Sequence, residues 1–262
     1  MRDALPTRRQ TLTALATLAG GSYLLGASTP ALAWPFSDKP SIRGSGRVVQ
    51  DKRPATGFHA VAASLPCTVK LVQGNSEGVD IEADDNLLAA IETVVEEGEL
   101  QLRWAKGYRV TGTNQIRLTV YLRQVDSLSV SGSADLSAIS LQAPRLDGSI
   151  AGSGHIAIQD LRSERLSVSI AGSGDFEVHG TGQALKVSIA GSGDFRAAHF
   201  AVQQATVDIA GSGNADLWVR KALTVSIVGS GDVRYYGEVI NPTVSVIGSG
   251  RVQALGVKPP VA

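Results

Sequence analysis

The chain has 262 residues, of which 43% are hydrophobic, and its 24 basic residues balance 24 acidic ones. This amount of apolar sequence supplies the core of one elongated domain or of two compact ones. A net charge of zero gives no basic surface that could displace counterions from phosphate, which excludes nucleic acid as a partner. The 29 glycines are too many for an average fold, so the sequence pattern has to account for them.

Residues 1–33 have the pattern of an export signal. The pair Arg8-Arg9 precedes a moderately apolar run from Leu12 to Gly26, and Ala31-Leu32-Ala33 fits the small-x-small rule for a cleavage site. Paired arginines favour the twin-arginine pathway, and an ordinary Sec signal that contains two arginines is the alternative. No later stretch reaches the roughly 18 apolar residues that span a bilayer. We therefore expect a bacterial protein exported to the periplasm, the cell surface or the medium, with no transmembrane anchor after signal cleavage.

Residues 34–43 form a Pro-containing leader, and residues 44–125 form a strand-rich segment that is less repetitive than the sequence after it. The pair Glu97-Gly98 is typical of a tight turn between two strands. Residues 84–91 have the pattern of one or two helical turns opened by an acidic cap. Cys67 is the only cysteine, which excludes a disulfide within the chain, and its apolar neighbours predict a buried thiol.

A repeated stretch organises residues 126–257. In the copy from Leu166 to Val178, apolar or glycine positions alternate with small polar ones, which is typical of a strand with one buried face. The two glycines of this copy lie on the apolar side, where a missing side chain permits a sharp corner or a close backbone approach. The copies follow one another at nearly constant intervals, and their first glycines are Gly132, Gly152, Gly172, Gly191, Gly211, Gly229 and Gly248.

A fixed period of about twenty residues without helical periodicity predicts a solenoid in which each repeat is one coil. The expected fold is all-β: a single-stranded, right-handed parallel β-helix with about 19–20 residues per coil, followed by a tail over residues 258–262. Each coil buries its apolar face against its neighbours, so leucine and isoleucine columns point inward and a serine column points outward. The inward columns are Leu146, Leu166, Leu185 and Leu223, then Ile150, Ile170, Ile189 and Ile209.

The chain also resembles a known family. The similar segments are Gly44-Ser45-Gly46-Arg47-Val48-Val49 with Arg53, Gly57-Phe58-His59-Ala60-Val61, Val69 to Gly74, and Ile81 to Leu88, followed by the Gly-Ser-Gly repeats. In this order, over about residues 44–255, they are similar to the bacterial domain called putative auto-transporter adhesin, head GIN domain. The resemblance implies an exported β-helical domain from the cell envelope, and it brings no catalytic residues with it.

Three sets of residues are candidates for binding. The outward serines present short hydroxyls on a flat face: Ser153, Ser173, Ser192, Ser212 and Ser230. Beside them run acidic residues of the same repeat: Asp175, Asp194 and Asp232. Trp104 and Tyr108 form a candidate aromatic patch for a carbohydrate, and the alternative is that they cap the end of the solenoid. The competing interpretation of the serines is also structural, because serine and alanine fit tightly stacked strands.

The sequence offers no catalytic or metal-binding constellation. The aspartate column comes from the repeat itself, which favours stacking over one unique reaction site, and the four histidines lack ligand spacing. Calcium-binding nonapeptide repeats have a much shorter period than the repeat found here. No glycine run is followed by the Lys-Ser/Thr of a phosphate loop. We therefore expect neither a metal nor a cofactor.

These features predict an exported, non-enzymatic β-solenoid: an adhesin-like or envelope-associated module with a binding or structural role. Its expected partners are a polysaccharide or an envelope protein, and self-association of the rods belongs to the same class. The alternative is a polysaccharide lyase or hydrolase built on a β-helix. Such an enzyme is expected to break its repeat with a non-repeating polar cluster, whereas residues 152–250 keep the repeat nearly unbroken.

Overall fold

The computed structural model describes residues 41–112 and 115–258. These residues form strands almost throughout, with one 3-10 helix, η1 (Leu88–Ala90), and no α-helix. The predicted export signal over residues 1–33, most of the leader and the end of the tail lie outside the described residues. Within the described ranges, no helix is long and apolar enough to cross a membrane.

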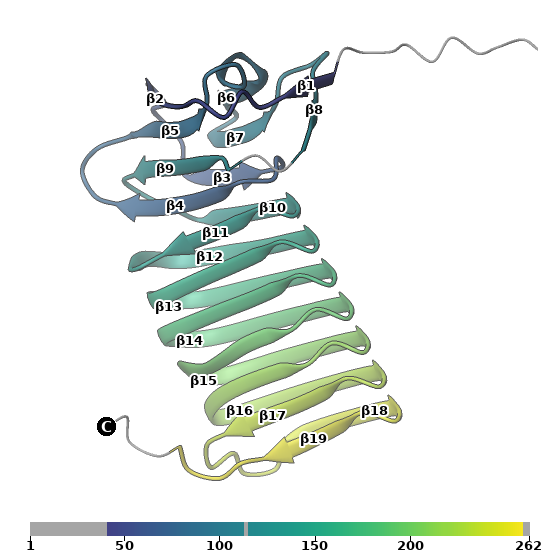
Figure 1. The fold of residues 1–262 in the computed structure, drawn as a ribbon. Helices are drawn as coiled ribbons and strands as arrows, with labels where there is room; N and C mark the ends of the chain where they lie inside the picture. The colour runs from purple at the N-terminus through teal and green to yellow at the C-terminus, as the bar shows by residue number, and fades with distance from the viewer. Residues whose placement is uncertain (1–40, 113–114, 259–262) are drawn as a thin grey trace, which may run out of the picture. The chain divides into compact units, whose positions relative to one another are not determined.

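Five long strands make up the regular part of the solenoid (Figure 1). They pair in parallel and in sequence order: β12 (Leu141–Gly152), β13 (His155–Gly172), β14 (Asp175–Gly191), β15 (Phe195–Gly211) and β16 (Ala215–Gly229). Shorter strands extend the stack: β10 (Ser127–Gly132) and β11 (Asp135–Ala138) before it, then β17 (Asp232–Tyr236), β18 (Thr243–Gly248) and β19 (Arg251–Ala254) after it. The predicted β-solenoid is therefore confirmed.

The Gly-Ser-Gly corners lie in register along the stack. The first glycines of the repeats, from Gly132 to Gly248, are successive Cα partners. At Gly172 φ is +122°, and a Cβ there would lie 2.5 Å from the carbonyl oxygen of Gly152. A Cβ at Gly174 would lie 2.4 Å from the carbonyl oxygen of Gly154. Both glycines are therefore required by the close approach of neighbouring coils, as the pattern predicts.

The core confirms the predicted inward columns. Leu166 is fully buried, Ile170 is 1% exposed, and the other predicted inward residues are at most 3% exposed. The rings of Phe176 and Phe195 lie in neighbouring coils with their centroids 5.8 Å apart. One continuous cluster of buried apolar side chains extends from the N-terminal coils to Tyr235. Each coil thus contributes a layer to a shared core, because none could bury its apolar face alone.

The strands before β10 follow a path that the repeat does not predict. β3 (Ala60–Ala63) and β4 (Thr68–Gln73) pair in parallel with β10 and β11 on one side, and with β7 (Glu99–Trp104) and β9 (Arg117–Leu122) on the other. The coil of β3 and β4 therefore lies between two coils that come later in the chain. Antiparallel strands cover the end of the stack: β6 (Ile91–Glu96) on β7, β5 (Gly78–Asp84) on β9, and β2 (Val48–Arg53) on β5. β1 (Ser41–Arg43) pairs separately with β8 (Arg109–Thr111).

Two local predictions in this segment have different outcomes. The tight turn is confirmed, because Glu96 faces Glu99 in the β6–β7 hairpin and Glu97 has a φ of 51°. The predicted helical turn is η1, but the predicted acidic cap is wrong: the N-cap residue is Leu87, without a side-chain hydrogen bond. The carboxylate of Asp85 instead accepts hydrogen bonds from Ser45 and Arg47, so it ties the loop before β2 to this turn.

No strand of the described residues covers the last coil. Val244 and Val246 of β18 are the Cα partners of the buried residues Val225 and Ile227, so they take inward positions. They are nevertheless 44% and 37% exposed. The two ends of the stack therefore differ, because antiparallel strands cover the first one.

Candidate functional site

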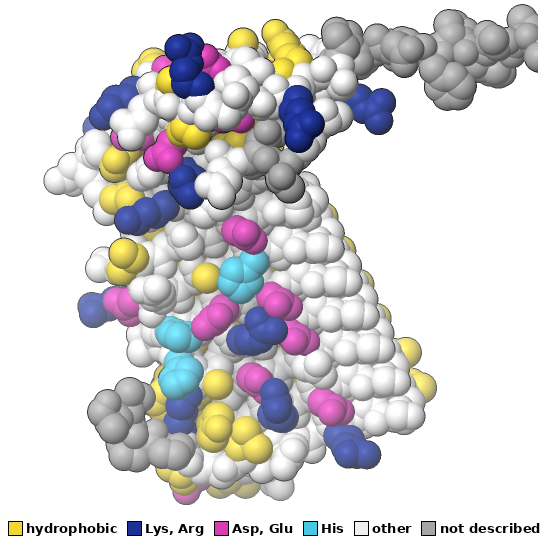
Figure 2. All heavy atoms as spheres, viewed as in Figure 1, with side chains coloured by type: hydrophobic (Ala, Val, Ile, Leu, Met, Phe, Trp, Pro, Cys, Tyr) yellow, Lys and Arg dark blue, Asp and Glu magenta, His cyan; other side chains and the backbone are white. Residues whose placement is uncertain are grey.

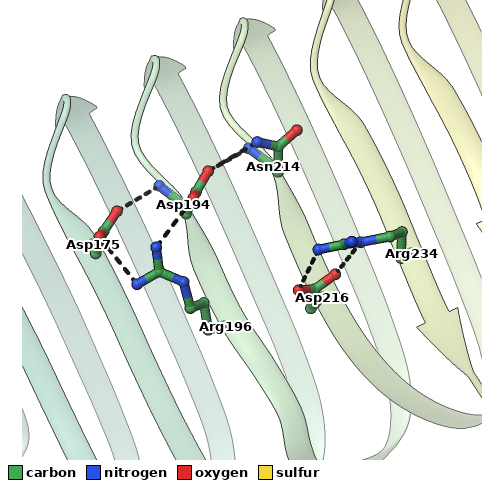
Figure 3. Close-up of polar contacts among 6 residues, drawn as sticks. All are labelled: Asp175, Asp194, Arg196, Asn214, Asp216 and Arg234. Carbon is green, nitrogen blue, oxygen red and sulfur yellow. Dashed lines mark hydrogen bonds and ion pairs between the residues drawn. The ribbon is translucent and has the colours of Figure 1, made fainter.

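Charged side chains gather on the face formed by the strands that follow each Gly-Ser-Gly corner, and a strip without charges lies beside it (Figure 2). The predicted acidic column lies on this face as a ladder across the coils (Figure 3). A carboxylate oxygen of Asp175 accepts a hydrogen bond from the backbone N–H of Asp194 at 3.1 Å. Asp194 accepts in the same way from Asn214 at 3.2 Å, Asn214 from Asp232 at 3.1 Å, and Asp232 from Arg251 at 2.9 Å. The column therefore satisfies backbone donors where the chain leaves each corner.

Arginines neutralise part of this acidic face. Arg196 donates to Asp175 at 3.0 Å and to Asp194 at 3.2 Å, and Arg234 donates to both oxygens of Asp216. Partial burial lowers the pKa of the Arg196 guanidinium, but the charges of Asp175 and Asp194 outweigh it and raise that pKa overall. Since these two carboxylates are committed to backbone and guanidinium donors, they do not form a free pair for acid–base chemistry.

The five predicted serines lie exposed at successive corners of the solenoid. The backbone N–H of Ser173 donates to the carbonyl oxygen of Gly152 at 2.9 Å, and the other corner serines repeat this contact. Because neighbouring coils are about 4.8 Å apart, the hydroxyls form a straight, closely spaced column. The structure thus brings the predicted serines together, and their role in binding stays a prediction.

Trp104 and Tyr108 lie apart from the repeat, at the end of β7 and in the loop before β8. Trp104 is partly buried and packs against the core, whereas Tyr108 is 40% exposed. This packing against the core supports the alternative interpretation, in which Trp104 caps the end of the solenoid. A binding role for the pair stays a prediction.

A groove that the sequence analysis missed encloses about 1470 Å³ and crosses β12, β13, β14 and β15. Its floor is made of small residues: Ala143, Ser163 and Gly182 are successive Cα partners. A Cβ at Gly182 would point into the core, 2.8 Å from the fully buried ring of Phe200, so this glycine lets the chain lie close to the core. Small residues therefore recur at this position of three consecutive coils along the groove.

Arginines and glutamines line this groove. Arg145 and Arg165 are Cα partners, so two exposed cationic side chains follow one another on neighbouring coils. No carboxylate lies within 4.0 Å of either guanidinium in the part of the chain that the structure describes. Arg162 has one loose ion pair, with Asp160 at 3.9 Å. The signal that could have revealed the site is the basic residue that recurs at one position of consecutive repeats, Arg145 and then Arg165.

One end of the groove is fixed by side chains from the N-terminal coils. Gln73 donates to the carbonyl oxygen of Gln142 at 3.0 Å and accepts from its N–H at 2.7 Å. Beside it, His59 and Asp126 form a contact of 2.9 Å. These contacts hold the β4 end against β12, so the groove has a rigid boundary there.

The described residues define a β-solenoid with a polar surface and a groove that crosses several coils. A family model described as "Putative auto-transporter adhesin, head GIN domain" matches residues 57–239, and the chain belongs to this family. No curated protein matches it.

Three solved structures of the same fold come from bacteria. A putative adhesin from Bacteroides fragilis has a TM-score of 0.77 and 22% identity, over 82% of this chain and all of that one. A structure described as a putative lipid binding protein from Parabacteroides distasonis has a TM-score of 0.70 and 23% identity, with the same coverage. A putative adhesin from Parabacteroides merdae has a TM-score of 0.67 and 22% identity, over 82% of this chain and 99% of that one. At these identities the similarity establishes the fold.

Proposed function

We propose that the chain is an exported, non-enzymatic, adhesin-like module that binds a polysaccharide of the cell envelope or its surroundings. The observation that carries this proposal is the open groove of about 1470 Å³ across four coils. It is larger than a typical small-molecule pocket and it runs over a backbone that is already fixed, so an extended ligand would bind with little ordering cost of the protein. Membership of the adhesin family supports the same function.

The binding surface of this proposal lies outside the coils. One structural neighbour is described as a putative lipid binding protein. In this chain, however, the space inside the coils is filled by large buried side chains, among them Phe176, Phe195 and Phe200. A close-packed interior of this kind has no room for an acyl chain, which favours the outer surface for any ligand.

The export part of the proposal rests on residues 1–33. Replacing Arg8 and Arg9 with Lys should keep the precursor in the cytoplasm if the twin-arginine pathway is used. Cell fractionation would measure this. Normal export of the variant would assign the signal to the Sec pathway instead.

Binding is tested by incubating the purified chain with a panel of envelope and extracellular polysaccharides. Both retention of the protein and newly formed reducing or unsaturated ends are recorded. Retention without new ends is the expected result. New ends would contradict the non-enzymatic assignment and favour the lyase or hydrolase alternative, and an absence of both signals would contradict polysaccharide binding.

A further inference from the structure

We propose that the groove across β12–β15 binds a linear anionic polysaccharide, an inference that rests on the proposed function and specifies its ligand. Two like charges follow one another in one column of the groove. Arg145 and Arg165 are Cα partners on neighbouring coils, which places their side chains about one coil spacing apart. Like charges in direct register destabilise a sheet unless a counter-charge offsets them.

The protein itself supplies little of that counter-charge. In the described ranges, no carboxylate lies within 4.0 Å of Arg145 or Arg165. Two acidic residues line the groove, Asp126 and Glu164. Asp126 contacts His59 at 2.9 Å. This differs from the neighbouring acidic face, where Arg196 and Arg234 are each held by carboxylates. The groove therefore presents guanidinium groups that are available to an external anion.

The remaining lining suits a sugar chain. Gln142, Gln183 and Gln204 are exposed and come from three different coils, and each carries both a donor and an acceptor for hydroxyl groups. Small residues, Ala143, Ser163 and Gly182, line its floor on three successive coils. Charged groups that repeat along a polymer would meet guanidinium groups that repeat along the coils.

The experiment measures the affinity of the purified chain for polygalacturonate, for alginate and for the methyl ester of polygalacturonate, which has the same backbone without the charge. We expect the two anionic chains to bind, the ester to bind at least tenfold more weakly, and added salt to weaken the anionic complexes. Arg145→Gln/Arg165→Gln should weaken anionic binding by about tenfold or more, because two charge-assisted contacts are lost. Lys70→Gln/Arg220→Gln removes the same net charge outside the groove and should stay within about twofold of the wild type.

Each other outcome overturns the proposal in a distinct way. Equal binding of the ester and the acid would leave polysaccharide binding intact but exclude anion recognition. Equal losses in the two double variants would show a non-specific charge effect. Tighter binding of polyglutamate than of both anionic glycans would assign the groove to acidic polypeptides. Failure to bind any glycan in this set and in the wider panel would overturn the proposed function as well.

A different observation carries a second inference: we infer that two copies of the chain associate tail to tail through β18 and β19. Within the described residues, β18 pairs only with β16, and β19 only with β17. Each strand therefore has one free edge, which is a template for further pairing. The inward residues Val244 and Val246 are exposed at the same end.

The free edges of β18 and β19 in one copy fit the same two edges in a second copy of the chain. A two-fold axis through Ser249 would place β18 of one copy antiparallel to β19 of the other. Val246 would then face Val252 of the second copy, and Val244 would face its Ala254, so that inward positions meet inward positions. Along a strand, the side chain and the backbone N–H and C=O groups both change direction at every residue. A register that pairs inward residues with inward residues therefore also places the free N–H and C=O groups of the two edges opposite each other. Arg251 is the only charged residue on the two strands and would face Ile247, which avoids a like-charge contact.

A cysteine placed on the predicted axis tests this arrangement directly. Ser249→Cys should form a disulfide between two copies under mild oxidation, because facing residues of antiparallel strands have Cα atoms within disulfide range. Ser153→Cys occupies the same corner position in an earlier coil and should not cross-link. The native Cys67 is buried and should not interfere.

The mass in solution gives the second readout. The wild type should sediment as a dimer, and Val246→Lys should make it monomeric because the lysine would lie in the apolar centre of the contact. Ile139→Lys, at a position that is 61% exposed elsewhere on the solenoid, should remain dimeric. A wild type that stays monomeric, or equal cross-linking of the two cysteine variants, would overturn the tail-to-tail contact.

Discussion

Glycine and serine have opposite roles within one corner of the solenoid. At Gly172 the backbone has a φ of +122°, and the place of a Cβ is taken by the carbonyl oxygen of Gly152. The next residue, Ser173, is exposed. Its hydroxyl can therefore contact a ligand without affecting the core. Within one corner, the glycine therefore serves the packing of neighbouring coils, and the next residue faces the solvent. This explains how the repeat can keep its glycines whatever its surface binds.

Gly172→Ala should destabilise the protein by about 2–4 kcal/mol, because the new Cβ meets backbone and the residue is forced into a left-handed φ. Ser173→Ala is the matched control at the neighbouring exposed position and should change stability by less than about 0.5 kcal/mol. Urea unfolding of both variants measures the difference. If the two substitutions had equal effects, coil stacking would not depend on the glycine.

Cys67 illustrates how burial controls reactivity at the scale of a residue. It is 7% exposed, and burial together with the charge of Asp135 raises the pKa of its thiol from 9.0 to about 12. The folded chain therefore keeps its proton where the unfolded chain loses it, so stability should fall as pH rises from about 9 towards 12. Cys67→Ala should show a smaller alkaline loss in thermal unfolding. An identical pH dependence in the variant would contradict this coupling.

At the scale of elements, the repeat and the N-terminal segment differ in how far the sequence predicts them. The inward columns around Leu166 and Ile170 could be predicted because alternation and period act locally and recur in each coil. The position of β3 between β7 and β10, and of β4 between β9 and β11, could not, because it depends on pairing between strands that are distant in the chain. The groove was missed for a related reason: its lining residues come together only once several coils are stacked.

The ladder of acidic residues gives a prediction at this scale. Asp194→Ala should cost about 1–2 kcal/mol, because the backbone N–H of Asn214 loses its acceptor at a half-buried position. Asp194→Asn should cost less than about 1 kcal/mol, since it keeps an acceptor and loses only a partly exposed ion pair with Arg196. Asn214 already fills this position in the next coil. Chemical denaturation of the two variants tests the order, and a larger loss for Asn than for Ala would contradict the ladder.

At the scale of the whole molecule, the coils act as nearly equivalent layers. From Gly132 to Gly248, each corner contacts only the corner before it and the corner after it in register. Stability should then be a sum of coil terms and contacts between neighbours, and the chain should tolerate loss of a layer if the register survives. The irregular N-terminal strands should not tolerate such a loss, because their spatial order differs from their sequence order.

Deletion of residues 173–191 tests this directly, since it removes one whole repeat and joins Gly172 to Ser192, which restores a Gly-Ser-Gly corner. We expect a folded, β-rich chain with a cooperative transition and a melting temperature lower by a few degrees, because one layer and one interface between layers are lost. Deletion of residues 173–182 is the control: it removes about half a coil, so every later inward residue would meet the wrong part of its neighbour. That variant should not fold. Circular dichroism and thermal unfolding of both variants measure the outcome. If the whole-coil deletion unfolded as completely as the half-coil deletion, the coils would not be interchangeable layers, and the stability of the solenoid would depend on specific contacts within individual repeats.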